Sequence, residues 1–275
     1  METVHSTGND IQIHVNGTTL CYDDVGKGSI PILFIHGFPF DKSSWQPQLE
    51  FLSKTHRVLA YDIRGFGKST EGTEKASIRL YADDLVKLMD ALQIQKAVVC
   101  GLSMGGYILL NAVSRYPERF EAIILSDTQC IADSAEGKEK RYKTITQIEE
   151  GGLTDFTEGF MKNIFCKESL ETKKVAVEKI KSIVLSTSPA TVTGALRALA
   201  ERDETCSMLD QVSVATLILC GKEDVVTPPA QSERMHAEIK NSTLRILEKA
   251  GHLSNMEQPD EFNRSIIHFL STHVK

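Results

Sequence analysis

Short apolar runs alternate along the chain with longer stretches whose apolar residues recur every three or four positions. The short runs are rich in Val and Ile, and several are continuously apolar, as expected of parallel strands buried on both faces. The predicted strands are 11–15, 19–23, 32–36, 57–61, 97–102, 122–126, 216–220 and 244–247. The longer stretches predict helices at 44–53, 78–92, 104–115, 229–238 and 259–272. This alternation favours an α/β fold, with a mostly parallel sheet of eight strands flanked by helices.

The alternation is interrupted between residues 131 and 205, where the pattern predicts helices and no strand. We expect these helices at 138–149, 155–165, 169–185 and 189–202, separated by the turn signals "EEGG" and "STSP". The strand pattern resumes at Val214. We therefore predict a core made of residues 1–130 and 206–275, with a helical cap, residues 131–205, inserted after the sixth strand.

A serine stands between the predicted strand 97–102 and the predicted helix 104–115. The stretch "GLSMG" at 101–105 has the pattern G-x-S-x-G, which in this setting predicts a sharp turn that exposes Ser103 at the end of the strand. Gly101 and Gly105 fit because larger side chains there would collide with the flanking strand and helix. A glycine-rich turn with a capping serine is the alternative interpretation.

A serine hydroxyl needs a base, and the base needs an acid. His252 follows the last predicted strand on a loop, whereas the six histidines at 5, 14, 56, 236, 268 and 273 lie in terminal, strand or helix contexts. Asp224 follows strand 216–220, which gives the order serine, acid, histidine. Asp127, at the end of strand 122–126, is the competing acid. We assign Ser103, Asp224 and His252 as the predicted catalytic residues.

Cleavage of an ester creates an oxyanion, which is usually bound by backbone N–H groups. The N–H of Met104, directly after the serine, is one predicted donor. The second is the N–H of Phe38 in "FIHGFPF", where Gly37 permits a sharp turn and Pro39 helps to fix the loop. We expect His36 to brace this loop by hydrogen bonding and not to serve as a second base.

The charge, the first residues and the cysteines indicate which partners, location and cofactors to expect. The formal net charge is −6, which gives no reason to expect nucleic acid or an anionic membrane as a partner. The first residues, "METVHSTGND", lack the apolar core of a signal peptide, and we expect a cytoplasmic protein. The six cysteines are scattered without a CxxC pair, so we expect free thiols, no metal site and no cofactor. The oligomeric state is left open.

Five segments together resemble the α/β-hydrolase superfamily: "HGFP" at 36–39, "DIRGFGKS" at 62–69, "GLSMGG" at 101–106, "GKEDVVTPP" at 221–229 and "AGHLSNMEQPDEF" at 250–262. The resemblance extends over the chain apart from residues 131–205, which correspond to the family's cap. It is greatest for small microbial carboxylesterases, 3-oxoadipate enol-lactonases and cofactor-free haloperoxidases or perhydrolases. "DIRGFGKS" resembles a structural loop of the family, so no catalytic role is given to Asp62, Arg64 or Ser69.

The resemblance implies a serine hydrolase that cleaves a small to medium carboxylic ester or lactone through an acyl-enzyme. Haloalkane dehalogenases and epoxide hydrolases carry aspartate where Ser103 stands, so those activities are set aside. Carbon–carbon bond hydrolysis and perhydrolysis stay open, as does a receptor role with slow or single-turnover hydrolysis. The substrate is expected between core and cap, and the candidates to line that space are Phe38, Phe40, Tyr107, Phe156, Phe160, Ile164 and Phe165.

Overall fold

A computed structural model describes residues 7–274, and its centre is one eight-stranded sheet. The strands are β1 (Gly8–Val15), β2 (Thr18–Val25), β3 (Ile32–Ile35), β4 (Val58–Tyr61), β5 (Ala97–Leu102), β6 (Phe120–Ser126), β7 (Ala215–Gly221) and β8 (Ser242–Leu247). Their order is β1-β2-β4-β3-β5-β6-β7-β8. The β1–β2 and β2–β4 pairs are antiparallel, and the other pairs are parallel. The carboxyl ends of β3, β5, β6, β7 and β8 therefore meet at one edge of the sheet.

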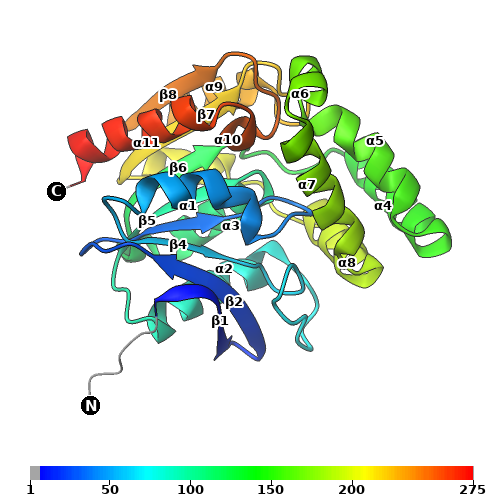
Figure 1. Cartoon of the computed structure of the whole chain (residues 1–275), viewed down its shortest axis with the longest axis horizontal. Coiled ribbons are helices and arrows are strands. Elements are labelled where there is room, and N and C mark those ends of the chain that lie inside the picture. The colour runs from blue at the N-terminus through cyan, green and yellow to red at the C-terminus, as the bar shows by residue number, and fades with distance from the viewer. Residues whose placement is uncertain (1–6, 275) are drawn as a thin grey trace.

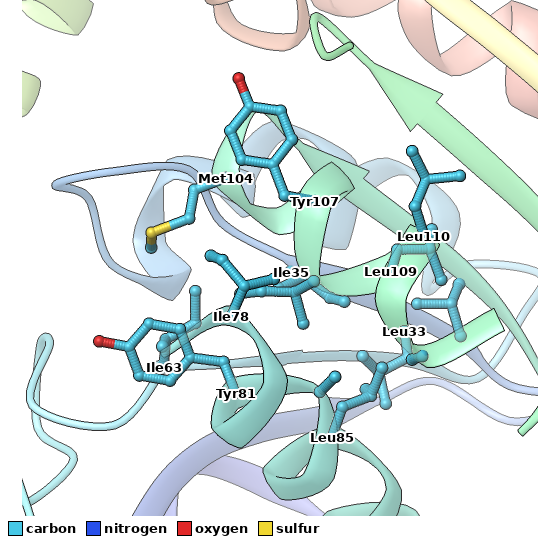
Figure 2. Close-up of a cluster of buried hydrophobic side chains, with 14 of the residues drawn as sticks. Leu33, Ile35, Ile63, Ile78, Tyr81, Leu85, Met104, Tyr107, Leu109 and Leu110 are labelled. Carbon is cyan, nitrogen blue, oxygen red and sulfur yellow. The ribbon is translucent and has the colours of Figure 1, made fainter. Parts of the chain in front are cut away.

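Helices cover both faces of the sheet (Figure 1). The helices are α1 (Gln46–Leu52), α2 (Ile78–Ala91), α3 (Met104–Arg115), α9 (Pro229–Glu238), α10 (Ser254–Glu257) and α11 (Pro259–His273). Alternate residues of β3 point to opposite faces, so Leu33 and Ile35 join one buried cluster with α2, α3 and α9, while Ile32 and Phe34 join another with α1 and α11. Figure 2 shows part of the first cluster, where Leu33 and Ile35 lie beside side chains of α2 and α3.

The segment between β6 and β7 is helical, and we call its helices α4–α8 the helical insertion. They are α4 (Ala135–Gly151), α5 (Thr154–Ile164), α6 (Lys167–Thr172), α7 (Lys174–Ser186) and α8 (Pro189–Ala200). Figure 1 shows them together beyond one edge of the sheet, in green to yellow. Ser134 and Ser188 cap α4 and α8, because their side chains accept hydrogen bonds from the N–H groups of Gly137 and Thr191.

Most predicted elements are present, and the differences have local causes. The predicted helix 169–185 is broken in two, since Lys173 leaves helical geometry between α6 and α7 (φ −104°, ψ 40°). The helix predicted at 44–53 begins as a 3₁₀ turn, Lys42–Trp45, before α1. The short helix α10 was not predicted, because a single turn within a loop has too few residues for a periodic pattern.

The expectation of six free cysteines was wrong. Cys130 and Cys206 form a disulfide, with their Cα atoms 4.8 Å apart, whereas Cys21, Cys100, Cys166 and Cys220 are free. The chain leaves the core after β6 and returns before β7 at the same place, where the N–H of Thr205 donates to the carbonyl of Cys130 (2.8 Å). A contact between residues 76 positions apart has no signature in local spacing.

No helix among residues 7–274 is long and apolar enough to cross a membrane. His5 lies outside the described residues.

Candidate active site

Ser103 occupies a strained turn between β5 and α3. Its backbone has a positive φ of 52° (ψ −113°), a conformation that L-residues rarely adopt. A Cβ at Gly101 would lie 2.3 Å from the carbonyl oxygen of Gly105, and a Cβ at Gly105 would lie 2.4 Å from that of Ile35. Both glycines are therefore required by close backbone approach, as the sequence suggested, and the turn presents the Ser103 hydroxyl at the sheet edge.

Three predicted residues are joined by hydrogen bonds. Ser103 Oγ lies 2.8 Å from His252 Nε2, and His252 Nδ1 lies 2.8 Å from Asp224 Oδ2. An ionised carboxylate only accepts hydrogen bonds, so the neutral imidazole carries its proton on Nδ1 and accepts from Ser103 through Nε2. All three side chains are buried. The arrangement can withdraw a proton from the serine and stabilise the cation that results.

The loop after β7 fixes the Asp224 carboxylate. Its Oδ1 accepts hydrogen bonds from the N–H groups of Val226 (2.8 Å) and Thr227 (2.9 Å), and its Oδ2 accepts one from Thr227 Oγ (2.8 Å). Thr227 Oγ1 also lies 3.3 Å from His252 Nδ1. Sequence reasoning missed Thr227, although its position three residues after an aspartate is a turn signal.

In both His252 and Asp224, burial and the attraction between the two charges shift the pKa in opposite directions. Burial by itself would lower the pKa of His252, but the negative charge of Asp224 and its hydrogen bond outweigh burial, so the pKa is raised. Burial would raise the pKa of Asp224, but the charge and hydrogen bond of His252 and the Thr227 donors lower it. The pair therefore favours a charged carboxylate beside a histidine with strengthened basicity.

The competing acid, Asp127, lies close by but makes no hydrogen bond to His252. Its carboxylate accepts from the N–H of Gly221 (2.8 Å) and from the hydroxyls of Ser126 (2.8 Å) and Ser254 (2.5 Å). Burial first, and then repulsion by Asp224, raise the pKa of Asp127 to about 7. Asp224 is thus the carboxylate that contacts the imidazole.

The two predicted oxyanion donors border the same space as Ser103. Phe38 and Met104 both line the cavity described below, and within residues 7–274 neither backbone N–H donates a hydrogen bond. Gly37 permits this approach, because a Cβ there would lie 3.2 Å from Ser103 Cβ. His36 braces the loop: its Nδ1 lies 2.8 Å from the carbonyl of Gly37, and its Nε2 accepts from the N–H of Ile63 (2.9 Å). The Phe38–Pro39 peptide is cis.

A cavity of about 630 Å³ opens above Ser103 and His252, within the range typical of small-molecule sites. Its apolar part is lined by Phe38, Met104, Tyr107, Phe156, Phe160, Leu196, Leu199, Val225 and Val226. Its other wall is polar and includes Lys140, Arg141, Thr144 and Gln147 of α4, spaced so that they share one helix face. Figure 2 shows Met104 and Tyr107 on α3, with the Tyr107 hydroxyl directed away from the buried cluster.

Three expected lining residues lie elsewhere. Phe40 is fully buried, with its ring 6.0 Å from that of Phe160, so it supports the wall from behind. Ile164 and Phe165 are buried in the core cluster that contains α1 and α11. The α4 wall was not predicted, although its spacing of three and four residues was visible in the sequence.

One group of potential metal ligands occurs among the described residues, formed by Asp127, Cys220 and Asp224, whose ligand atoms lie within 4.8 Å of one another. All four carboxylate oxygens already accept hydrogen bonds, and Cys220 Sγ contacts the carbonyl of Gly221 (3.3 Å). The group is therefore explained by hydrogen bonding within the protein.

A model of the family described as the alpha/beta hydrolase fold matches residues 30–259. The chain belongs to the alpha/beta hydrolase family. It is 31% identical to 3-oxoadipate enol-lactonase 2 of Acinetobacter baylyi, over 90% of this chain and 91% of the other. The structure resembles a thermophilic esterase from Thermogutta terrifontis (TM-score 0.91, 33% identity, 96% and 99% of the two chains covered). It also resembles the enol-lactonase from Burkholderia xenovorans (TM-score 0.88, 28% identity, 95% and 100% covered).

Proposed function

We propose that this alpha/beta hydrolase is a serine hydrolase that cleaves a small to medium carboxylic ester or lactone through an acyl-enzyme. The observation that carries the proposal is the hydrogen-bonded series Ser103–His252–Asp224 at the base of the cavity. The similarity to esterases and enol-lactonases supports the same class of substrate.

In the first half of the reaction, His252 removes the proton of Ser103 as Oγ attacks the substrate carbonyl. Asp224 holds the histidine tautomer and stabilises the imidazolium. The N–H groups of Phe38 and Met104 are free to bind the tetrahedral oxyanion. His252 then protonates the leaving alcohol or enol, which gives an acyl ester on Ser103.

In the second half, His252 activates a water molecule that attacks the acyl carbonyl. The new oxyanion uses the same two N–H groups, and collapse of the intermediate returns the proton to Ser103 and releases the acid. Residues 131–205 act as a cap in this proposal, since α4, α5 and α8 supply cavity walls and none of the proposed reacting groups.

Steady-state hydrolysis of p-nitrophenyl acetate and butyrate tests this function. We expect many turnovers per molecule, with product linear in time. A burst of one equivalent followed by no further release would contradict the hydrolase and favour a receptor with single-turnover chemistry. A parallel screen of esters, lactones and peracid formation would identify the preferred acyl group.

A further inference from the structure

The loops that carry Ser103, Asp224 and His252 all attach to one short segment, residues 126–128. The N–H of Ser103 donates to the carbonyl of Ser126 (2.9 Å), and Thr128 Oγ1 donates to the carbonyl of Ser103 (2.8 Å). The N–H of Asp127 donates to the carbonyl of Leu219 in β7 (2.9 Å). The Ser103 turn is therefore hydrogen-bonded to both chain neighbours of Asp127, a residue to which the proposed reaction gives no role.

The Asp127 side chain extends these attachments to the other two loops. Its Oδ1 accepts from the N–H of Gly221, three residues before Asp224, and its Oδ2 accepts from Ser254, two residues after His252. Asp127 is fully buried and has a positive φ of 43°. A strained, buried carboxylate with three donors is held by its surroundings, so its position is well determined.

Asp127 also brings a second negative charge to the site. Carboxylate oxygens of Asp127 and Asp224 lie within 4.8 Å of each other. The negative charge of Asp127, like that of Asp224, raises the pKa of His252. Two other titratable groups face Asp127, the thiols of Cys100 in β5 and Cys220 in β7. Glu257 in α10 faces His252, and its charge also raises the pKa of His252.

We propose that Asp127 is a positioning residue, whose carboxylate fastens the Asp224 and His252 loops to the Ser103 turn. Its negative charge also favours the imidazolium form of His252. The role rests on the proposed function, in which His252 is the base. Asp127 hydrogen-bonds to each loop but does not touch His252, so it holds the reacting groups in place through other residues, while its charge acts on His252 through space. Its protonation near neutral pH would weaken the base as the pH falls.

The experiment compares the wild type with Asp127→Asn, which removes the charge and keeps the side-chain size. The His252 titration is followed by NMR in the resting protein, with His252→Asn used to assign the signal. We expect the pKa of His252 to fall in Asp127→Asn, because an anion that stabilises the imidazolium is gone. The acid limb of kcat/KM should move to lower pH. The value of kcat/KM at neutral pH should fall roughly tenfold, because the loops that hold Asp224 and His252 lose their anchoring carboxylate.

Two further variants separate charge from packing. Thr128→Val removes a hydrogen bond to the Ser103 carbonyl without changing a charge, so it should lower kcat/KM and leave the His252 titration in place. Ser254→Ala removes one donor to Asp127, which disfavours the ionised carboxylate, so it should shift the His252 titration in the same direction as Asp127→Asn but by less.

An unchanged His252 titration in Asp127→Asn would overturn the proposal, whatever happens to the rate. If that variant does not fold, an unchanged titration in Ser254→Ala would overturn it instead. Failure of the proposed hydrolysis would be distinct, since the wild type would then lack ester turnover while the NMR titration still reported on Asp127.

Discussion

The sheet edge and the helical insertion face the same cavity, but they are built differently. At the sheet edge, Ser103, Asp224 and His252 are buried and each is fixed by hydrogen bonds from neighbouring loops. Along α4 and α5, the lining residues Lys140 and Asp155 are exposed. A site fixed on rigid elements suits chemistry that needs exact geometry, whereas a half-exposed helical wall can vary without disturbing it.

The two regions are joined at a few defined points. Glu257 accepts from the N–H of Gly251, next to His252, through Oε1 (2.8 Å), and from the N–H of Cys166 at the start of α6 through Oε2 (2.9 Å). In the segments that connect the insertion to the core, Asp133 pairs with Arg202 (2.7 Å), and Asp133 also pairs with Arg141 of α4. We therefore expect substitutions at the sheet edge to abolish turnover, and substitutions in the insertion to alter stability or substrate preference.

The largest effect is expected from Ser103→Ala. The variant lacks the proposed nucleophile, so kcat for p-nitrophenyl acetate should fall by about 10⁵ or more, while the melting temperature stays close to that of the wild type. A serine-directed phosphonate should label Ser103 in the wild type and leave the variant unlabelled. Retention of a tenth of the wild-type kcat would show that the nucleophile is assigned wrongly.

Asp224→Asn should have the next largest effect, with a loss of roughly 10⁴ in kcat. The amide cannot stabilise the imidazolium, and it favours the wrong tautomer of His252. The matched control is Asp127→Asn, a buried carboxylate in the neighbouring loop for which we expect a far smaller loss. The reverse ranking of the two kcat values would move the acid to the end of β6.

The disulfide tests how the insertion is attached. Replacing both Cys130 and Cys206 by Ala should lower the free energy of unfolding by about 2–4 kcal/mol, because the unfolded chain regains the freedom of a long loop. Acetate hydrolysis should change little, since neither residue lines the cavity. Thiol labelling of unfolded wild-type protein without reductant should count four free cysteines. Six free thiols, or an unchanged melting temperature in the double variant, would contradict this.

The sequence was most informative where one physical requirement dominates. A continuously buried strand and a glycine-flanked serine defined β5 and α3 to the residue. The order of serine, acid and histidine suggested three side chains that the fold brings within hydrogen-bonding distance, although their catalytic roles remain predictions. Contacts between distant segments were not accessible, so the disulfide, the Glu257 link and the burial of Phe40 appeared only in the structure.

The smallest effect is expected from Phe160→Ala, which asks whether the insertion sets substrate choice. Phe160 lies on α5, lines the cavity, and packs against Phe38 and Phe156 with ring centroids 6.3 and 5.4 Å apart. Its removal enlarges the apolar wall without touching Ser103, so KM and chain-length preference should change by a few-fold while acetate kcat is kept. The measurement is kcat/KM for acetate through octanoate esters, together with the melting temperature.

Met161→Ala is the matched control, because Met161 is the next residue of α5 but is buried in the core and does not line the cavity. It should lower the melting temperature and leave the ratio of octanoate to acetate kcat/KM unchanged. If Phe160→Ala behaved in the same way, with equal loss at every chain length and a lower melting temperature, Phe160 would be a packing residue. Selectivity would then have to come from the polar α4 wall or from Val225 and Val226 at the sheet edge, and the division between the two regions would be drawn in the wrong place.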